Sequence, residues 1–300
     1  PETRPTASRC GALDEKRPWA FHNTTESCSM VGSGAPMRWK RVVIFGMGGA
    51  FAILVALVWM TIEGVFDPPR PPPALTEGQR ETLHSDTVAG FDAYSAGNYS
   101  DAIKLWHSRA SASDSEAQFW LARMYDFGQG IQPNSLVAAE LYKSSANLGH
   151  PIAMYNLAYL YESGVGVGHD PSAAFTLWER AATLGYARAK YSLARAYLLG
   201  IGVSADSVTA VFWYEQAAEG GEPWAMSALA NRYFFGEGVG RDLVQSYKWA
   251  YIGGELGNAR TWIIRIVLFV CSNSEERKRA KRLGDAWLSE YSGAKSNGYR

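Results

Sequence analysis

Residues 153–185 read AMYNLAYLYESGVGVGHDPSAAFTLWERAATLG, and this pattern returns every 36 residues. A fixed period of about 20 to 50 residues is the sequence signature of a solenoid, in which small supersecondary units stack on one another. The sequence therefore predicts four units within residues 115–258, which are 115–150, 151–186, 187–222 and 223–258.

Each unit reads as a pair of helices joined by a turn. The first helix carries Ala-x-x-x-Leu-Ala-x-x-Tyr, and a spacing of four places Ala, Leu and Tyr on one face. A Gly-x-Gly pair then breaks this helix, because glycine accepts positive φ. An Asn or Asp stands where the second helix needs an N-cap. One such pair cannot bury its own apolar face, whereas stacked pairs can, so we predict an all-α solenoid. The positions in register are Ala117, Ala153, Ala189 and Ala225; Leu121, Leu157, Leu193 and Leu229; Tyr125, Tyr161, Tyr197 and Tyr233; and the caps Asn134, Asp170, Asp206 and Asp242.

The residues on either side of the repeats also predict helices. Residues 76–114 hold two short stretches of helical apolar spacing around a Gly-Asn turn, which indicates an N-terminal helical hairpin. Residues 259–291 predict C-terminal capping helices, the last of which opens at the capping-box pattern Ser272-x-x-Glu275. We expect residues 292–300 to form a disordered tail.

The chain before residue 76 divides into three segments. Residues 1–41 are polar and lack periodicity, so we expect them to be disordered. Residues 42–62 carry no charge, and a helix of about 20 apolar residues crosses the ~30 Å core of a bilayer. Residues 63–75 contain the run DPPRPPP, which favours a semi-rigid polyproline II spacer. We therefore predict a transmembrane anchor and a stalk ahead of the repeats.

The charges that flank residues 42–62 predict the orientation of the anchor. Basic residues precede this segment and acidic residues follow it, so the positive-inside rule places the N-terminus in the cytoplasm. The repeats then lie on the far side of the membrane, in the periplasm if this is a bacterial inner membrane. Two alternatives are a cleaved signal peptide and a natural start at Met30 or Met37, of which Met37, followed by basic residues, fits better; the residues before the start would then be non-native.

Composition and motifs point away from several classes of protein. The formal net charge is 0, so no bulk attraction to nucleic acid is expected. The three cysteines, Cys10, Cys28 and Cys271, form no CxxC pair, which argues against a disulfide framework or zinc site. The sequence contains no HExxH, GxSxG or GxxxxGK[ST] motif, and its Gly-x-Gly pairs lack the third glycine of GxGxxG. We expect no cofactor, no metal and no catalytic activity.

The repeat pattern resembles that of the Sel-like repeat (SLR) family, which is related to the tetratricopeptide repeat. Residues 151–222 match the family pattern A-x-A-x-x-x-L-G-x-x-Y-x-x-G-x-G nearly throughout. Alanine replaces the usual glycine after Leu in all four units, and Gly253-Gly254 replaces Ala-Ala in the last. The resemblance implies right-handed superhelical stacking and a role in protein assembly or signalling, commonly without catalysis. In bacteria, such domains are often exported or periplasmic.

In tetratricopeptide-like stacks the first helices line the concave surface, so their positions away from the core stripe are candidates for partner binding. Arg and Tyr are enriched at interface hot spots, and Arg grips carboxylates in bidentate fashion. We expect this groove to hold an extended peptide or a partner helix. The alternative is that the aromatic side chains pack between helices and the arginines are solvated. The candidate residues are Phe119, Arg123, Tyr155, Tyr159, Arg188, Tyr191, Arg195, Trp224 and Asn231.

The sequence thus favours a membrane-anchored, non-catalytic scaffold that binds a protein partner in the cell envelope. An enzyme that acts on the cell wall or on β-lactams is the alternative, because some members of the resembling family are cysteine-rich proteins with that activity. The repeats here carry no cysteine, which argues against this alternative.

Overall fold

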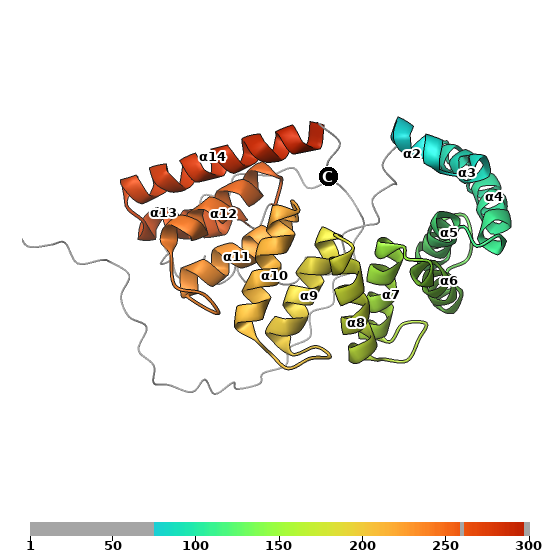
Figure 1. Cartoon of the computed structure of the whole chain (residues 1–300), viewed down its shortest axis with the longest axis horizontal. Helices are drawn as coiled ribbons and strands as arrows, with labels where there is room; N and C mark the ends of the chain where they lie inside the picture. Colours follow the sequence, from blue (N-terminus) through green and yellow to red (C-terminus); the bar gives the residue numbers. More distant parts are fainter. Residues whose placement is uncertain (1–74, 259–260, 297–300) are drawn as a thin grey trace, which may run out of the picture. The chain divides into compact units, whose positions relative to one another are not determined.

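A computed structural model describes residues 75–258 and 261–296, which all belong to the second of two compact units, Pro68–Arg300. All regular secondary structure in these residues is helical (Figure 1), which confirms the predicted all-α class. The helices are α2 (Glu77–Thr82), α3 (Ser85–Ser95), α4 (Tyr99–Ser111), α5 (Ser115–Phe127), α6 (Ser135–Asn147), α7 (Pro151–Ser163), α8 (Pro171–Thr183), α9 (Ala187–Leu199), α10 (Ser207–Glu219), α11 (Pro223–Phe235), α12 (Leu243–Glu255), α13 (Thr261–Cys271) and α14 (Ser274–Ser296).

The segments predicted as the disordered tail, the membrane anchor and most of the stalk lie outside the described residues. Within the two described ranges, no helix combines the length and the apolar character that crossing a bilayer requires.

Four repeats of two helices each follow one another along the stack. The first helices are α5, α7, α9 and α11, and the second helices are α6, α8, α10 and α12, all 13 residues long. Each first helix ends at a left-handed glycine, and each second helix begins at the predicted Asn or Asp, whose side chain accepts a backbone N–H of the first turn. Such a cap contributes about 1 kcal/mol to stability.

The core follows the 36-residue register. The alanines and leucines in register on the first helices, which are Ala117, Ala153, Ala189 and Ala225 and Leu121, Leu157, Leu193 and Leu229, are at most 3% exposed. Helix α4 of the N-terminal hairpin and the second helices of repeats one to three each contribute one large, almost fully buried side chain at the same register position, and these are Trp106, Tyr142, Trp178 and Tyr214. The tyrosine that ends each predicted stripe is only half-buried. Its backbone has a separate role, because the carbonyl oxygens of Tyr125, Tyr161, Tyr197 and Tyr233 accept the N–H of the four cap residues at 2.8–2.9 Å.

In repeats two to four, the second glycine of the turn is where one repeat contacts the repeat before it. A Cβ at Gly202 would overlap the carbonyl oxygen of Pro171, the first residue of α8. Gly166 and Gly238 face the corresponding carbonyls of Ser135 and Ser207. Glycine is thus required here for close approach between backbones as well as for its positive φ.

The two ends of the stack depart from the repeat pattern. At the N-terminal end, α3 and α4 form a hairpin in which Gly90 lies against the Trp106 ring, while the indole N–H of Trp106 donates to the carbonyl of Thr87 at 3.2 Å. At the C-terminal end, α14 packs against α12, and Tyr291 lies on Gly221 in the turn between α10 and α11.

The start of α14 differs from the prediction, which placed a capping box at Ser272 and Glu275. Asn273 and Glu276 form the box instead, with each side chain accepting the other residue's backbone N–H at 2.9 and 2.8 Å. The hydroxyl of Ser272 donates to the carbonyl of Leu268 and so is committed to the end of α13. The helix then runs to Ser296, past residue 291 where the predicted tail begins.

We expect Gly202→Ala to lower the free energy of unfolding by roughly 2 to 4 kcal/mol, because it adds an overlap with Pro171 to the cost of a left-handed residue. Gly185→Ala is the matched control, since Gly185 also has positive φ but has no atom near its would-be Cβ. That variant should lose only about 1 to 2 kcal/mol. Urea unfolding of residues 68–300, monitored by circular dichroism, measures the loss of unfolding free energy in both variants. Equal losses would show that Gly202 is not required for close approach between backbones.

Candidate functional site

The first helices carry the predicted binding residues on one surface that runs along the stack. We call this the first-helix surface and define it by the eight predicted side chains that are half-buried. They are Arg123 on α5; Tyr155 and Tyr159 on α7; Arg188, Tyr191 and Arg195 on α9; and Trp224 and Asn231 on α11.

The ninth candidate, Phe119, was predicted to face solvent, and this is wrong, because its side chain is 2% exposed. The ring of His150 stacks on it at a centroid distance of 4.6 Å. His150 is fixed there by two contacts. Its Nδ1 accepts the N–H of Ala153 at 3.1 Å as the cap of α7, and its Nε2 lies 3.0 Å from Oε2 of Glu116. The residue that caps α7 therefore covers Phe119.

Aromatic rings of repeat two form a continuous cluster at the first-helix surface. Tyr155 meets Tyr159 edge-on at 5.1 Å and Tyr186 at 5.2 Å, and Tyr159 meets Trp178 at 5.8 Å. Burial raises the pKa of both Tyr155 and Tyr186 above the usual tyrosine value. Their phenols therefore stay protonated at neutral pH and act as hydrogen-bond donors as well as acceptors.

Arg195 brings a positive charge to the edge of this cluster. Its guanidinium lies 3.7 Å from a carboxylate oxygen of Glu162 on α7, and the two side chains are only 28% and 22% exposed. Burial alone would lower the pKa of Arg195, but the nearby Tyr159 and Glu162 more than offset this effect and raise it. Tyr191 and Tyr214, which are 5.6 Å apart, complete the surroundings of this charge.

A cavity of about 570 Å³ opens beside the same surface, between the start of α9 and the turn that leads into α11. Arg188 and Lys190 line it from α9, and Glu219 and Glu222 line it from the other side. The Glu222 side chain is 6% exposed and caps α11, and one of its oxygens lies 3.5 Å from Nε of Arg188. The cavity therefore has walls of opposite charge.

Arg123 is the charged residue of repeat one on this surface. Its guanidinium lies 4.8 Å from the ring centroid of Trp120 and 5.7 Å from that of Phe127, within the range of cation–π attraction. Trp224 and Asn231 lie half-buried on α11, in repeat four.

Sequence reasoning missed Tyr186, Tyr214 and Trp178 as members of this site. The sequence register could have identified Tyr186. The equivalent residues of the other first helices, Asp114, His150 and Glu222, accept a backbone N–H as N-caps, whereas the tyrosine side chain makes no such bond. Tyr214 and Trp178 belong to second helices, which the helix-by-helix pattern assigns to the core.

The arrangement is suited to binding. Its polar groups are phenols and guanidinium groups on rigid helices, set among rings that offer apolar contact area. Within residues 75–258 and 261–296, no three His, Cys, Asp or Glu side chains gather in a way that would hold a metal ion.

A scan against protein-family models assigns the repeats directly. The model described as the Sel1 repeat matches residues 115–150, 151–186, 187–222 and 225–258. Residues 115–258 therefore carry four Sel1 repeats. Sel1 repeat proteins are generally scaffolds for protein interaction, and the fold and the match support that general role here. A search of curated proteins finds no match.

Several solved structures resemble this chain. The Sel1 repeat protein from Oxalobacter formigenes is 25% identical with a TM-score of 0.58, over 72% of this chain and 84% of that one. A protective antigen of uropathogenic Escherichia coli with an SLR fold is 24% identical with a TM-score of 0.48, over 69% and 53%. The immunity protein PA5088 from Pseudomonas aeruginosa is 17% identical with a TM-score of 0.44, over 73% and 88%.

The position of Phe119 in the core gives a test by stability. We expect Phe119→Ala to lower the free energy of unfolding by about 3 to 5 kcal/mol, because it opens a cavity under His150. Phe127→Ala, on the same helix but 46% exposed, should lose less than about 1 kcal/mol. Urea unfolding of both variants measures these losses. A small loss of unfolding free energy for Phe119→Ala would contradict its place in the core.

Proposed function

We propose that this protein is a non-catalytic scaffold that binds a protein partner on its first-helix surface. One observation carries the proposal. Tyrosine rings and half-buried arginines of repeats two and three form one continuous surface, with Tyr155, Tyr159 and Arg195 at its centre. Rigid aromatic side chains provide contact area at a low cost in conformational entropy, which is why they dominate binding hot spots.

The chemistry of the surface favours an acidic partner. Arg195 lies 3.7 Å from Glu162, which is longer than a charge-assisted hydrogen bond of about 2.7 to 2.9 Å. A carboxylate of the partner, from an acidic side chain or a C-terminus, would form the shorter bidentate pair. The neighbouring phenols supply further donors to the same group, and the rings would pack against its apolar neighbours.

Partner capture tests this proposal. We expect residues 68–300 to enrich a protein from a membrane and envelope extract, and Arg123→Ala/Arg195→Ala to lose at least about tenfold of it. Arg279→Ala/Arg282→Ala is the matched control, because it removes the same charge from exposed positions on α14. Circular dichroism checks that each variant is folded. Equal capture by all three proteins would rule out the first-helix surface.

We further propose that residues 42–62 anchor the protein in a bacterial inner membrane with the repeats in the periplasm. The support is the uncharged run and the basic residues that precede it. Protease added to spheroplasts should digest a C-terminal tag on the full chain, since the positive-inside rule places the tag outside the cytoplasm. A cytoplasmic marker protein, intact in the same sample, is the control. A tag protected until the membrane is lysed would reverse the orientation.

A further inference from the structure

Helix α13 is the most apolar helix at the C-terminal end of the stack. Its sequence, TWIIRIVLFVC, contains a single charged residue, Arg265. Ile264 and Leu268 face inwards and join the core of repeat four. On the opposite side, Ile266, Phe269 and Val270 are 52%, 61% and 78% exposed. Helices that are apolar on all sides are normally buried, so this outer stripe, spaced i, i+3 and i+4, is a surface without its cover.

The repeat geometry explains why the stripe is bare. Thr261 follows Ala225 by one repeat length, and α13 packs on α12 as the next first helix would. Every other first helix is covered by its own second helix. Here the following helix, α14, packs on α12 instead, where its Asp285 accepts the hydroxyl of Tyr251 at 2.7 Å. Among the described helices, none therefore takes the place of a second helix on α13.

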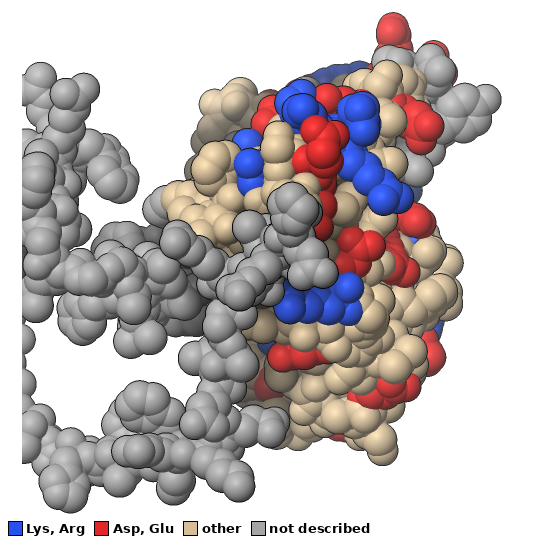
Figure 2. All heavy atoms as spheres, turned by 90° about the vertical axis from the view of Figure 1, so that its left-hand side faces the viewer, with Lys and Arg blue, Asp and Glu red and all other residues tan. Residues whose placement is uncertain are grey.

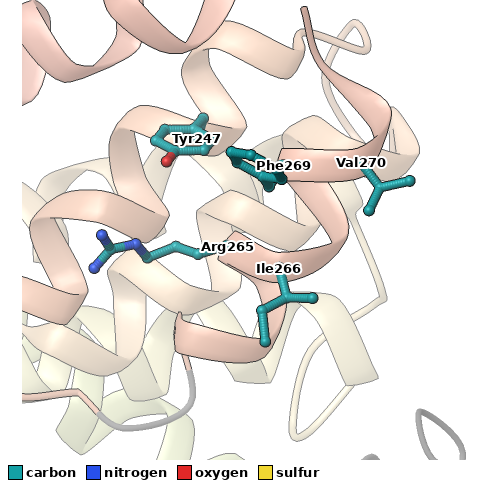
Figure 3. Close-up of a pocket in the computed structure, with 5 residues that line it drawn as sticks. All are labelled: Tyr247, Arg265, Ile266, Phe269 and Val270. Carbon is teal, nitrogen blue, oxygen red and sulfur yellow. The ribbon is translucent and has the colours of Figure 1, made fainter. Parts of the chain in front are cut away.

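We propose that a second copy of this chain covers the stripe, with α13 of each copy packed on α13 of the other about a twofold axis. Such an interface is self-complementary, so one contact covers the same apolar face on both molecules. A cavity of about 340 Å³ lies beside the stripe, lined by Tyr247, Arg265, Ile266, Phe269 and Val270. Figure 3 shows Phe269 turned towards Tyr247, whereas Val270 projects outwards. The projecting valine of one copy is placed to enter the cavity of the other.

The charges around the stripe favour a copy over an anionic membrane. Arg265 and Glu255 are both partly exposed, at 35% and 47%, and lie 3.9 Å apart. A twofold axis would let each of these charges face its opposite in the other copy. Figure 2, which views the side where α13 and α14 lie, shows both signs of charge interspersed. The formal net charge of 0 adds no repulsion between copies.

The basic residue that lies on Phe269 is also committed within the chain. The Arg277 guanidinium lies 4.4 Å from the centroid of the Phe269 ring, and it donates to the carbonyl oxygens of Phe269 and Ser272. It closes the end of α13, and a lipid phosphate would have to displace it from these bonds. A membrane surface site would instead present a basic face around its apolar side chains.

Three exposed side chains are fewer than an obligate dimer uses, since stable interfaces bury about 800 Å² on each partner. The expected dimer is therefore weak and exchanges with the monomer at micromolar concentrations. It leaves the first-helix surface of each copy in place, so it does not depend on the function proposed above.

Sedimentation velocity of residues 68–300, from roughly 1 to 200 µM, tests the proposal. The wild type should shift from monomer to dimer across this range. Val270→Lys should raise the dimer dissociation constant ~10-fold or more, because it places a charge in the interface instead of a buried valine. Val208→Lys is the matched control, since Val208 on α10 is 67% exposed and lies away from α13. It should dimerise as the wild type does.

Two outcomes would overturn the proposal. One is a monomer at every concentration, and the other is a dimer that Val270→Lys leaves unchanged, which would place the contact elsewhere. A parallel flotation assay with vesicles of anionic phospholipid distinguishes dimer formation from binding to a membrane. If the wild type binds these vesicles but stays monomeric, and Val270→Lys abolishes the binding, the stripe is a lipid-binding surface. Circular dichroism of both valine variants confirms that any change arises from the surface and not from unfolding.

Discussion

The fold depends on a contact between backbones that leaves no room for a side chain. In repeats two to four, the second glycine of the turn, of which Gly202 is an example, lies against the carbonyl at the start of the second helix in the preceding repeat, whereas Gly130 of repeat one lies against Cβ of Tyr99 in the N-terminal hairpin. This contact sets how closely and at what angle neighbouring repeats stack. It also explains why the turn has the same length in all four repeats, since an inserted residue or a larger side chain would separate the two backbones. The constant turn length contributes to the fixed period of 36 residues in the sequence.

A fixed stacking distance has a direct effect on the candidate site. Residues one period apart are placed side by side on successive first helices, so Tyr159 and Arg195 become neighbours although they are 36 residues apart. The chain thereby builds a wide surface of aromatic and basic side chains from short, local elements. Changes at single register positions alter that surface without altering the stack, because these positions lie outside the Ala and Leu stripe that forms the core.

The sequence was sufficient to predict most of the repeat architecture, because helices, caps and turns are local. Each cap, such as Asp206, and each turn glycine can be recognised from its own neighbours in the chain. The exceptions depend on residues from elsewhere. Phe119 has the helical phase of a surface residue, but it is buried because Tyr142 of α6 and His150, the cap of α7, pack against it. The capping box moved to Asn273 because Ser272 is held by the end of α13.

The candidate site was predicted in part for the same reason. The phase of a residue on its own helix identified Tyr155, Tyr159 and Arg195, whose positions follow from spacing alone. It could not identify Tyr214, which reaches the site from a second helix, or Glu162, whose pairing with Arg195 joins two repeats. Side chains that meet across repeats require the stacking angle, and that angle is a property of the folded stack.

The return of α14 along the stack gives the two ends different mechanical strength. Nearly all other contacts join helices that are adjacent in sequence, so the repeats can unzip one after another from a free end. Tyr291, in contrast, lies on Gly221, about two repeat lengths earlier in the chain. The C-terminal helix thereby latches repeat four to the end of repeat three, and it must detach before either can open from that side. Pulled or partly unfolded, the chain should lose its N-terminal hairpin first and keep its last two repeats longest.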